Sequence, residues 1–475
     1  MSRVARLALV CGLCGHAVAS PRSDPTAGRS VFTGATMAAA SSIDLDPAAI
    51  GPGQQSYLYL AATAVIDRYG VRLDHLDVDS GAITPGDTVH DNELGAGGDF
   101  AYVWHLSDRA ALGFEARSAP GETFIANRDT LAYHTLGGGQ RTYTAGIGTS
   151  IRLTDTIYFG LSLDSAANYL RLHYARDTAL ERGHGPGGID SDCGAGSACG
   201  VENPAAAEHY DVNVQTSLFS TSNLILNLGF LINLSKDVWL GISYHTPPGL
   251  QTQTRLTGTM DVRLAPRDGG AILHGASSVF LTQPASADLE LRARLPAQLD
   301  LHVAARWEDL SRFQSYDVRG YGSTFDAAQL PEWQLRARGF HDPLSVWAGV
   351  EQVELVREDY QLLLGGRIGF ETSSLPDDLT SPATISPFSY TADLGAQLRA
   401  GPVVLQATYG LQYFPTVNVT DSAFDPRSRI ACIASNYDYS TAACTAVRNG
   451  YGIPSADGRY DRLEHAIRFA LIMDL

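Results

Sequence analysis

The chain has 475 residues, of which 18% are charged and 47 are glycine, and its formal net charge is -17. This acidity argues against a nucleic-acid partner, because binding to phosphates requires a basic surface. The mean hydropathy is -0.06, and no run of about 18 apolar residues follows the N-terminus, which excludes a membrane-spanning helix.

Residues 1–19 have the organisation of an export signal. Arg3 and Arg6 make the start positive, Leu7 to Gly15 form a short apolar stretch, and Ala17-Val18-Ala19 resembles a cleavage site. The apolar stretch is too short to span a bilayer. We therefore predict a signal peptide that is cleaved after export.

Residues 20–54 differ from everything that follows them. The stretch from Gly28 to Gly53 is rich in small residues, contains Ala38-Ala39-Ala40-Ser41-Ser42, and does not alternate between apolar and polar positions. Because residues 55–475 do alternate, we expect them to form a wall around this stretch.

Alternation with the period of a β-strand begins after Gln55 and continues to Leu475. The segments on either side of Pro296 show it most clearly, with leucine, valine and alanine on one face and acids, arginines and His302 on the other. A soluble sandwich would bury the apolar face, whereas a membrane barrel would turn it to lipid. Alternation alone does not separate these two folds.

Connection lengths favour the barrel. Tight turns are expected at residues 106–109, 153–156, 234–237, 296–297, 356–358 and 399–402, and long polar connections at about 75–96, 119–140, 178–220, 263–285, 315–331, 372–386 and 416–458. Short turns at one rim and long loops at the other are typical of outer-membrane barrels. We count about fourteen strands and predict an all-β, 14-stranded antiparallel transmembrane barrel spanning residues 55–475.

Four cysteines remain after removal of the signal peptide, in two local pairs: Cys193 with Cys199, and Cys432 with Cys444. Export to an oxidising compartment favours disulfides. Free thiols or a metal site are the alternatives, but no histidine stands at ligand spacing beside either pair. We expect two local disulfides and no metal.

The sequence contains no motif of a phosphate-binding loop, a nucleophilic serine or a zinc protease. Some outer-membrane barrels are hydrolases, and His245, His302 and His465, which fall within predicted strands, are the candidate general bases. His465 shares a face with leucine and phenylalanine, His302 shares one with Asp300 and Arg306, and no activated nucleophile is recognisable in the sequence. We therefore expect no catalytic residues, no enzymatic activity and no cofactor.

Two segments that we expect to be loops carry more apolar side chains than exposed loops need. Their apolar residues include Leu218, Phe219, Ile272, Leu273 and Phe280. An exposed apolar surface of this kind often marks a binding site, although packing of one loop on another would give the same composition.

Several arginines are expected to point into the barrel. Arg306, Arg336 and Arg367 could each hold a bound carboxylate through charge-assisted hydrogen bonds. The alternative is that they pair with inward-facing acids of the wall.

The order of these features resembles the FadL-type outer-membrane transporters of long-chain fatty acids and other hydrophobic compounds. Gly28 to Gly53 resembles the N-terminal plug of that family, with Asp46-Pro47-Ala48-Ala49 where the family typically has Asn-Pro-Ala-Gly. Phe100 to Gly121 is similar to the second and third strands. Leu295-Pro296-Ala297, followed by Trp307 to Phe313, is similar to the Leu-Pro-Ala and Trp-Thr-Asp-Trp-Ser segments.

The resemblance implies a monomeric barrel in the outer membrane of a Gram-negative bacterium, surrounded by lipid and lipopolysaccharide, with residues 20–54 as a hatch inside it. Hydrophobic ligand would be caught by extracellular loops, pass to a pocket in the lumen and leave sideways through the wall without an energy source. Long-chain fatty acids are the expected ligands. The alternatives are aromatic hydrocarbons, or a structural or general-diffusion barrel.

The resemblance also assigns roles to individual residues. Asp46, Pro47 and Ala48 would form the hatch contact, and Ser118, Pro120 and Gly121 the kink of the third strand. Proline lacks an N–H and interrupts a β-ladder, which suits such a kink. Asp46 departs from the usual Asn, and a buried charge at that position must be paired or protonated.

Overall fold

The computed structural model describes residues 30–38, 42–53, 55–76, 83–123, 130–177, 211–250, 254–264, 269–281, 283–313, 315–322, 333–337, 339–357, 359–423 and 456–475. The predicted signal peptide lies outside these residues, so its cleavage stays a prediction. None of the helices within the described ranges is both long enough and apolar enough to cross a membrane.

The two predicted disulfides also lie outside the described residues. Cys193 and Cys199 fall between the described ranges 130–177 and 211–250, and Cys432 and Cys444 fall between 359–423 and 456–475. The structure therefore does not confirm a bond between Cys193 and Cys199, nor one between Cys432 and Cys444. Both pairings stay predictions from the sequence.

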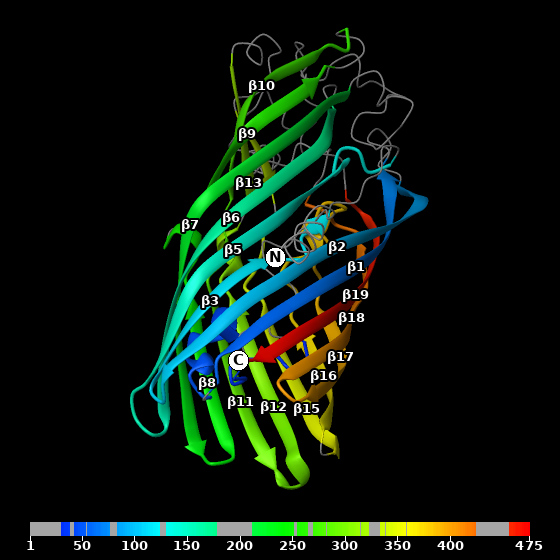
Figure 1. Cartoon of the computed structure of the whole chain (residues 1–475). Coiled ribbons are helices and arrows are strands. Elements are labelled where there is room, and N and C mark those ends of the chain that lie inside the picture. The colour runs from blue at the N-terminus through cyan, green and yellow to red at the C-terminus, as the bar shows by residue number, and fades with distance from the viewer. Residues whose placement is uncertain are drawn as a thin grey trace.

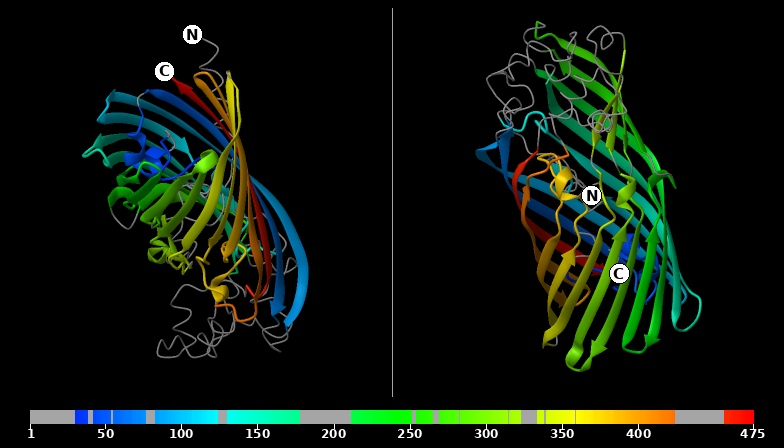
Figure 2. Two further views of the ribbon diagram at one scale, coloured as in Figure 1. Left: turned by 90° about the horizontal axis from the view of Figure 1, so that it is seen from below. Right: turned by 180° about the vertical axis from the view of Figure 1, so that it is seen from behind.

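The described residues form a closed antiparallel barrel of fourteen strands (Figures 1 and 2). The strands of the ring are β1 (Tyr57–Leu76), β2 (Ile83–Ser107), β3 (Ala110–Ser118), β5 (Gly137–Arg152), β6 (Ile157–Asp177), β7 (Asp211–Ser235), β8 (Val238–His245), β11 (Ser286–Leu295), β12 (Leu299–Glu308), β15 (Leu344–Val356), β16 (Tyr360–Glu371), β17 (Ser389–Ala400), β18 (Val403–Val419) and β19 (Gly458–Asp474). The ring closes where β1 pairs with both β2 and β19. This confirms the predicted fold class and strand number.

The six tight turns lie where the sequence predicts them. Each joins neighbouring strands of the ring, for example β2 to β3 at Asp108-Arg109 and β17 to β18 at Gly401-Pro402. We call the half of the barrel near these turns the turn-side half, and the opposite half the loop-side half. Strand β1, for example, begins in the turn-side half at Tyr57 and ends in the loop-side half at Leu76.

Several segments predicted as long connections are wholly or partly strands. They include β4 (Glu122–Thr123), β10 (Ile272–Leu281) and β13 (Ser315–Tyr321), together with the loop-side parts of β2 and β7. Two further strands, β9 (Thr254–Arg263) and β14 (Trp333–Ala337), lie almost wholly outside the predicted connections. The strands β9, β10, β13 and β14 continue the wall on the loop side by pairing successively from β7. The exposed side chains of β9 are polar, for example Arg255 and Asp261, whereas β10 exposes Ile272 and β13 exposes Tyr321.

Short helical turns complete the described structure. They are α2 (Ser42–Leu45), η1 (Pro47–Ile50), η3 (Pro248–Leu250), η5 (Pro296–Gln298), η6 (Leu310–Arg312) and η7 (Asp377–Leu379). Of these described turns, α2 and η1 precede the first strand.

The polarity of the wall inverts along the strands. In the turn-side half of β1, Leu60 points outward and Asp67 points inward, whereas farther along Arg68 is exposed and Val71 is completely buried. The same inversion occurs on β6, where the inward residue Asp164 gives way to Leu170. The turn-side half is therefore apolar outside and polar inside, and the loop-side half is the reverse.

This inversion marks how much of the barrel a membrane would surround. The strand β1 has 20 residues, about 66 Å at ~3.3 Å per residue. A tilted crossing needs only about 9–11 residues. The apolar belt of the turn-side half supplies that length, and the loop-side half extends beyond it like a water-soluble β-structure with its own apolar interior.

Candidate functional site

The N-terminal residues 30–53, which we call the inner segment, lie inside the ring (dark blue in Figure 2). The inner segment contacts the wall on several sides. Ser150 on β5 donates a hydrogen bond to the carbonyl of Ala48 at 2.9 Å, and Ser30 is hydrogen-bonded to Thr408 on β18 at 3.0 Å. These contacts come from widely separated strands, so the inner segment occupies the turn-side lumen.

Asp46 starts the helical turn η1. Its Oδ1 accepts a hydrogen bond from the backbone N–H of Ala48 at 2.8 Å, and the residue is completely buried. Its Oδ2 has no hydrogen-bond partner among the described residues. Burial raises the pKa of Asp46 well above its usual range, and the carboxylates of Asp288 and Glu290 raise it further, against the lowering by the Ala48 N–H. Burial thus shifts the balance of Asp46 toward the protonated carboxyl.

Asp44 connects the inner segment to β3. Its two carboxylate oxygens lie 2.6 and 2.7 Å from the two terminal nitrogens of Arg117. Burial by itself raises the pKa of Asp44, but the charge and hydrogen bond of Arg117 outweigh it and hold the pKa below its usual value. Because Arg117 directly precedes Ser118, this ion pair joins the inner segment to the predicted kink.

Glycines of the wall allow the inner segment to approach the strands. A Cβ on Gly160 would lie 2.0 Å from the nitrogen of Ala48, and one on Gly229 would lie 1.9 Å from Oδ1 of Asp46. Other inward glycines in close contact with the inner segment are Gly113, Gly148, Gly241, Gly365 and Gly395. At Gly160 and Gly241 an added side chain would overlap the backbone of the inner segment, so the wall is shaped to receive this segment.

A buried ionic cluster anchors the other end of the inner segment. Glu290 on β11 accepts hydrogen bonds from the backbone N–H and hydroxyl of Thr36 at 3.3 and 3.0 Å. His302 on β12 lies 2.9 Å from the same carboxylate through Nδ1 and 3.4 Å from Glu351 through Nε2. His302 is therefore a positioning group of this cluster, with carboxylates on both sides of its ring.

Glu351 and Arg367 hold residues 32 and 33. The N–H of Phe32 donates to Glu351 at 3.0 Å, and Nη2 of Arg367 donates to the carbonyl of Thr33 at 2.5 Å. Arg367 also lies 3.8 Å from Glu351. The inner segment is thus bound to the wall by charge-assisted hydrogen bonds at residues 32–36 and at Asp44.

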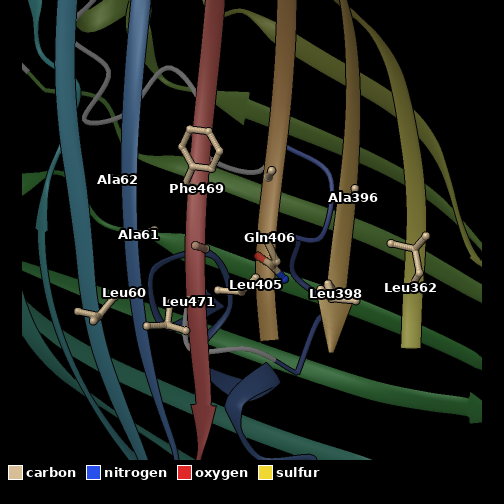
Figure 3. A pocket seen from close by; sticks show the side chains of 12 residues that line it. Leu60, Ala61, Ala62, Leu362, Ala396, Leu398, Leu405, Gln406, Phe469 and Leu471 are labelled. Carbon is tan, nitrogen blue, oxygen red and sulfur yellow. The ribbon is translucent and has the colours of Figure 1, made fainter. Parts of the chain in front are cut away.

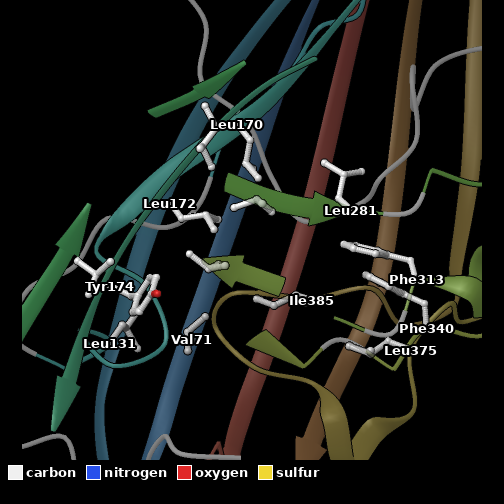
Figure 4. Packing of buried hydrophobic residues seen from close by; sticks show 14 of the residues in the cluster. Val71, Leu131, Leu170, Leu172, Tyr174, Leu281, Phe313, Phe340, Leu375 and Ile385 are labelled. Atoms are coloured by element: carbon white, nitrogen blue, oxygen red, sulfur yellow. The ribbon is translucent and has the colours of Figure 1, made fainter. Parts of the chain in front are cut away.

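Above the inner segment, the interior of the loop-side half is a large apolar cluster (Figure 4). It combines inward side chains of the strands with residues from the connections. Members from the strands include Val71, Leu170, Leu172, Leu218 and Val279; members from the connections include Leu131, Phe313, Phe340, Leu375 and Ile385. The rings of Phe313 and Phe340 stack with centroids 5.4 Å apart. This interior suits an apolar ligand.

The wall is interrupted at the predicted kink. The last pairing of β3 with β2 is between Ser118 and Gly98, and β4 pairs with β5 alone among the described strands. Pro120 offers no N–H to the ladder, and Gly121 adopts a positive φ of 72°. The backbone between β3 and β4 instead lies against β2, where a Cβ on Gly97 would be 2.5 Å from the carbonyl oxygen of Ser118.

The residues predicted to capture ligand lie on strands instead of loops. Leu218, on β7, is buried in the apolar cluster, and Leu273, on β10, packs against it. Phe219 and Ile272 are exposed. Phe280 lies between the guanidinium groups of Arg255 and Arg319, at 5.7 and 4.9 Å from its ring centroid. The structure therefore places two of the five beside the apolar interior.

The arginines predicted as carboxylate contacts have protein partners where they are described. Arg306 donates to the hydroxyl of Ser286 at 3.2 Å and lies 3.7 Å from Asp288. Arg367 is bound to the inner segment, as described above. Arg336 is on β14, and its side chain lies outside the described residues.

An apolar groove of about 560 Å³ lies on the outer surface, across β1 and β16 to β19 (Figure 3). Its rim includes Leu60, Leu405 and Phe469, whose side chains are exposed on the apolar belt. Because the groove lies on the outer face of the wall, away from the lumen, it is not part of the candidate passage.

The chain forms a closed fourteen-stranded barrel that holds its own N-terminal segment in the lumen, and this combination defines its structural class. No family model and no curated protein matches the sequence. Among solved structures, the chain is similar to a Pseudomonas aeruginosa FadL homologue, with a TM-score of 0.71 and 15% identity over 97% of this chain and 100% of that one. The chain thus has the FadL-type fold, as the sequence resemblance predicts.

Two further solved structures have the same fold. The P. putida toluene transporter TodX matches with a TM-score of 0.60 and 13% identity over 92% of this chain and 94% of that chain. The CymD monoaromatic hydrocarbon channel matches with a TM-score of 0.58 and 12% identity over 92% and 93%. These names describe a transporter and a channel.

Proposed function

We propose that this protein is an outer-membrane channel for the passive uptake of hydrophobic molecules, with long-chain fatty acids as its main ligands. The apolar interior of the loop-side half carries this proposal. A channel for polar solutes needs a hydrated lumen, whereas here the loop-side interior is apolar and the turn-side interior is occupied by the inner segment.

The route begins at the loop side, where Leu218 and Leu273 border the apolar cluster. A ligand partitions into this interior because removal of its apolar surface from water is favourable. The inner segment then acts as a hatch that blocks passage along the barrel axis. Asp46, Pro47 and Ala48 hold it close to the wall at Gly160 and Gly229.

The interrupted wall at Ser118, Pro120 and Gly121 supports a lateral exit. The ion pair between Asp44 and Arg117 links the hatch to β3 beside this interruption. A movement of the hatch would therefore be transmitted directly to the kink. A ligand that displaces the hatch would therefore also move β3 and open the wall at the kink.

Aromatic hydrocarbons are the second candidate ligands. The solved structures with the same fold include proteins named as a toluene transporter and a monoaromatic hydrocarbon channel. Both ligand classes are apolar, and they differ in length and in the carboxylate that only a fatty acid carries.

The test is uptake by a Gram-negative host that lacks its own outer-membrane channel for these compounds. Radiolabelled oleate and toluene are supplied to cells producing wild type, a version without residues 28–53, or no channel. We expect wild type to restore oleate uptake, and the truncated barrel to admit small polar solutes as well. Toluene uptake without oleate uptake would select the aromatic ligands, and uptake of neither compound would overturn the proposal.

A further inference from the structure

Arg141 on β5 spans the interruption in the wall. Residues of β5 on either side of it are paired, Tyr143 with Ser118 of β3 and Gln140 with Glu122 of β4. Opposite Arg141, the residues between β3 and β4 are not paired with β5 as a strand. The guanidinium crosses this place, and its Nη2 donates a hydrogen bond to the carbonyl of Ala96 on β2 at 2.8 Å.

The side chain is buried in this position, with 8% of its surface exposed. Its Nη1 lies 3.4 Å from the hydroxyl of Tyr143, and its Nε lies where a Cβ on Gly121 would be 3.1 Å away. Within the described residues, Nε has no hydrogen-bond partner. A buried guanidinium therefore keeps one donor free at the lateral interruption.

The surroundings of Arg141 change from polar to apolar along the outer face. Toward the loop side the outward positions become polar, as at Arg68 and Asn92, which are paired with each other. Toward the turn side the outward residues are apolar and exposed, with Phe114 and Ile147 directly paired on β3 and β5. Arg141 thus lies at the boundary of the apolar belt.

This arrangement fits a ligand with an anionic head and a hydrocarbon tail. The tail can lie along the apolar belt, where a lipid chain also lies, while the head stays at its polar boundary. Arginine binds carboxylates through strong charge-assisted hydrogen bonds. A neutral hydrocarbon would gain nothing from such a group.

We propose that Arg141 binds the carboxylate of a fatty acid as the ligand leaves the barrel beside Ser118 to Gly121. This inference rests on the proposed function and makes it more specific, because it selects carboxylate-bearing amphiphiles among the hydrophobic ligands. In the absence of ligand, the same side chain closes the interruption through its bond to Ala96.

The test compares two probes with the same chain, oleate and oleyl alcohol, in the uptake assay described above. The variants are Arg141→Gln, which removes the charge, and Arg141→Lys, which retains it. Arg152→Gln is the matched control, because Arg152 lies on the same strand at the turn side and is paired with Asp155 at 3.0 Å. Barrel assembly is checked by heat-modifiable migration in gels.

We expect Arg141→Gln to reduce oleate uptake roughly tenfold or more, the effect of losing a charge-assisted hydrogen bond, and to change oleyl alcohol uptake less than about twofold. Arg141→Lys should recover part of the oleate uptake, and Arg152→Gln should match wild type. Equal changes for both probes, or no change for oleate, would overturn the role of Arg141. If wild type transports oleyl alcohol but not oleate, the carboxylate inference and the assignment of fatty acids as main ligands fail, whereas hydrophobic uptake stands. Transport of neither compound defeats the proposed function as a whole.

Discussion

Substitution of Gly160 by alanine tests whether the inner segment closes the barrel. A methyl group at this position would lie 2.0 Å from the nitrogen of Ala48 and 2.2 Å from the carbonyl carbon of Pro47. Favourable carbon contacts lie at about 3.5–4.0 Å, so the segment has to move by about 1.5 Å. Nothing on the outer face of the barrel changes.

The size of the effect follows from the displaced contacts. Overpacking costs about 1–3 kcal/mol, and the displacement also weakens the hydrogen bond from Ser150 to Ala48, which contributes about 1 kcal/mol. A total of about 2–4 kcal/mol shifts the docking equilibrium by roughly thirty-fold to several-hundred-fold. Gly160→Ala should therefore show frequent openings in single-channel recordings in planar bilayers, whereas wild type stays closed.

Gly366→Ala is the matched control for this substitution. It also introduces one methyl group into a strand, but the nearest atom to its Cβ is the Cδ2 of Leu394 at an ordinary 3.4 Å. We expect this variant to remain closed like wild type. If Gly160→Ala folds as a heat-modifiable barrel and yet never opens more often than Gly366→Ala, the inner segment does not close the lumen as we reason.

Two further substitutions test the hatch and the apolar interior. Because the pKa of Asp46 is raised, its contribution to docking is complete below its ordinary pKa and is lost as pH rises through the raised value. Wild-type openings should increase with pH, and Asp46→Asn, which cannot ionise, should remove this dependence; a flat wild-type profile would contradict it. Leu170→Asn buries an unpaired amide in the apolar cluster and should lower oleate and toluene uptake roughly tenfold, whereas the outward His173→Asn should not. Equal uptake by these two variants would count against passage through the cluster.

The wall of the barrel could be predicted because the alternation of apolar and polar residues that specifies each strand is a local property of the sequence. A residue and its second neighbour share a face, so Leu289 and Leu291 or Asp300 and His302 reveal the two sides without knowledge of the fold. The tight turns follow from short polar interruptions between such segments. The loop-side strands β10 and β13 were missed because they contain many small and polar residues, and a period-2 pattern with few large apolar residues resembles a loop.

The anchoring of the inner segment could not be predicted, because its partners are far apart in sequence. Thr36 and Glu290 are separated by 254 positions, and Phe32 and Glu351 by 319. No pattern in either stretch identifies the other. One overlooked signal was available: inward strand positions such as Gly160 carry glycine, which weakens a strand unless another backbone approaches it. Together with the alternation, these glycines indicate where a segment packs inside.

The turn-side half of the barrel is polar inside and apolar outside, and the loop-side half is the reverse. This arrangement restricts the direction in which an apolar ligand could leave. In the turn-side lumen it would meet buried charges such as Glu290, Glu351 and Arg367, which hold the inner segment. Pushing hydrocarbon between them would break their hydrogen bonds without replacement, and each unpaired buried charge is costly. At the interruption beside Ser118, by contrast, the apolar belt of the outer face lies on the other side of the wall. On the proposed lateral route we expect the free energy of an apolar ligand to fall, whereas along the axis it rises. We therefore expect displacement of Arg141 to be a smaller obstacle than removal of the inner segment from the lumen.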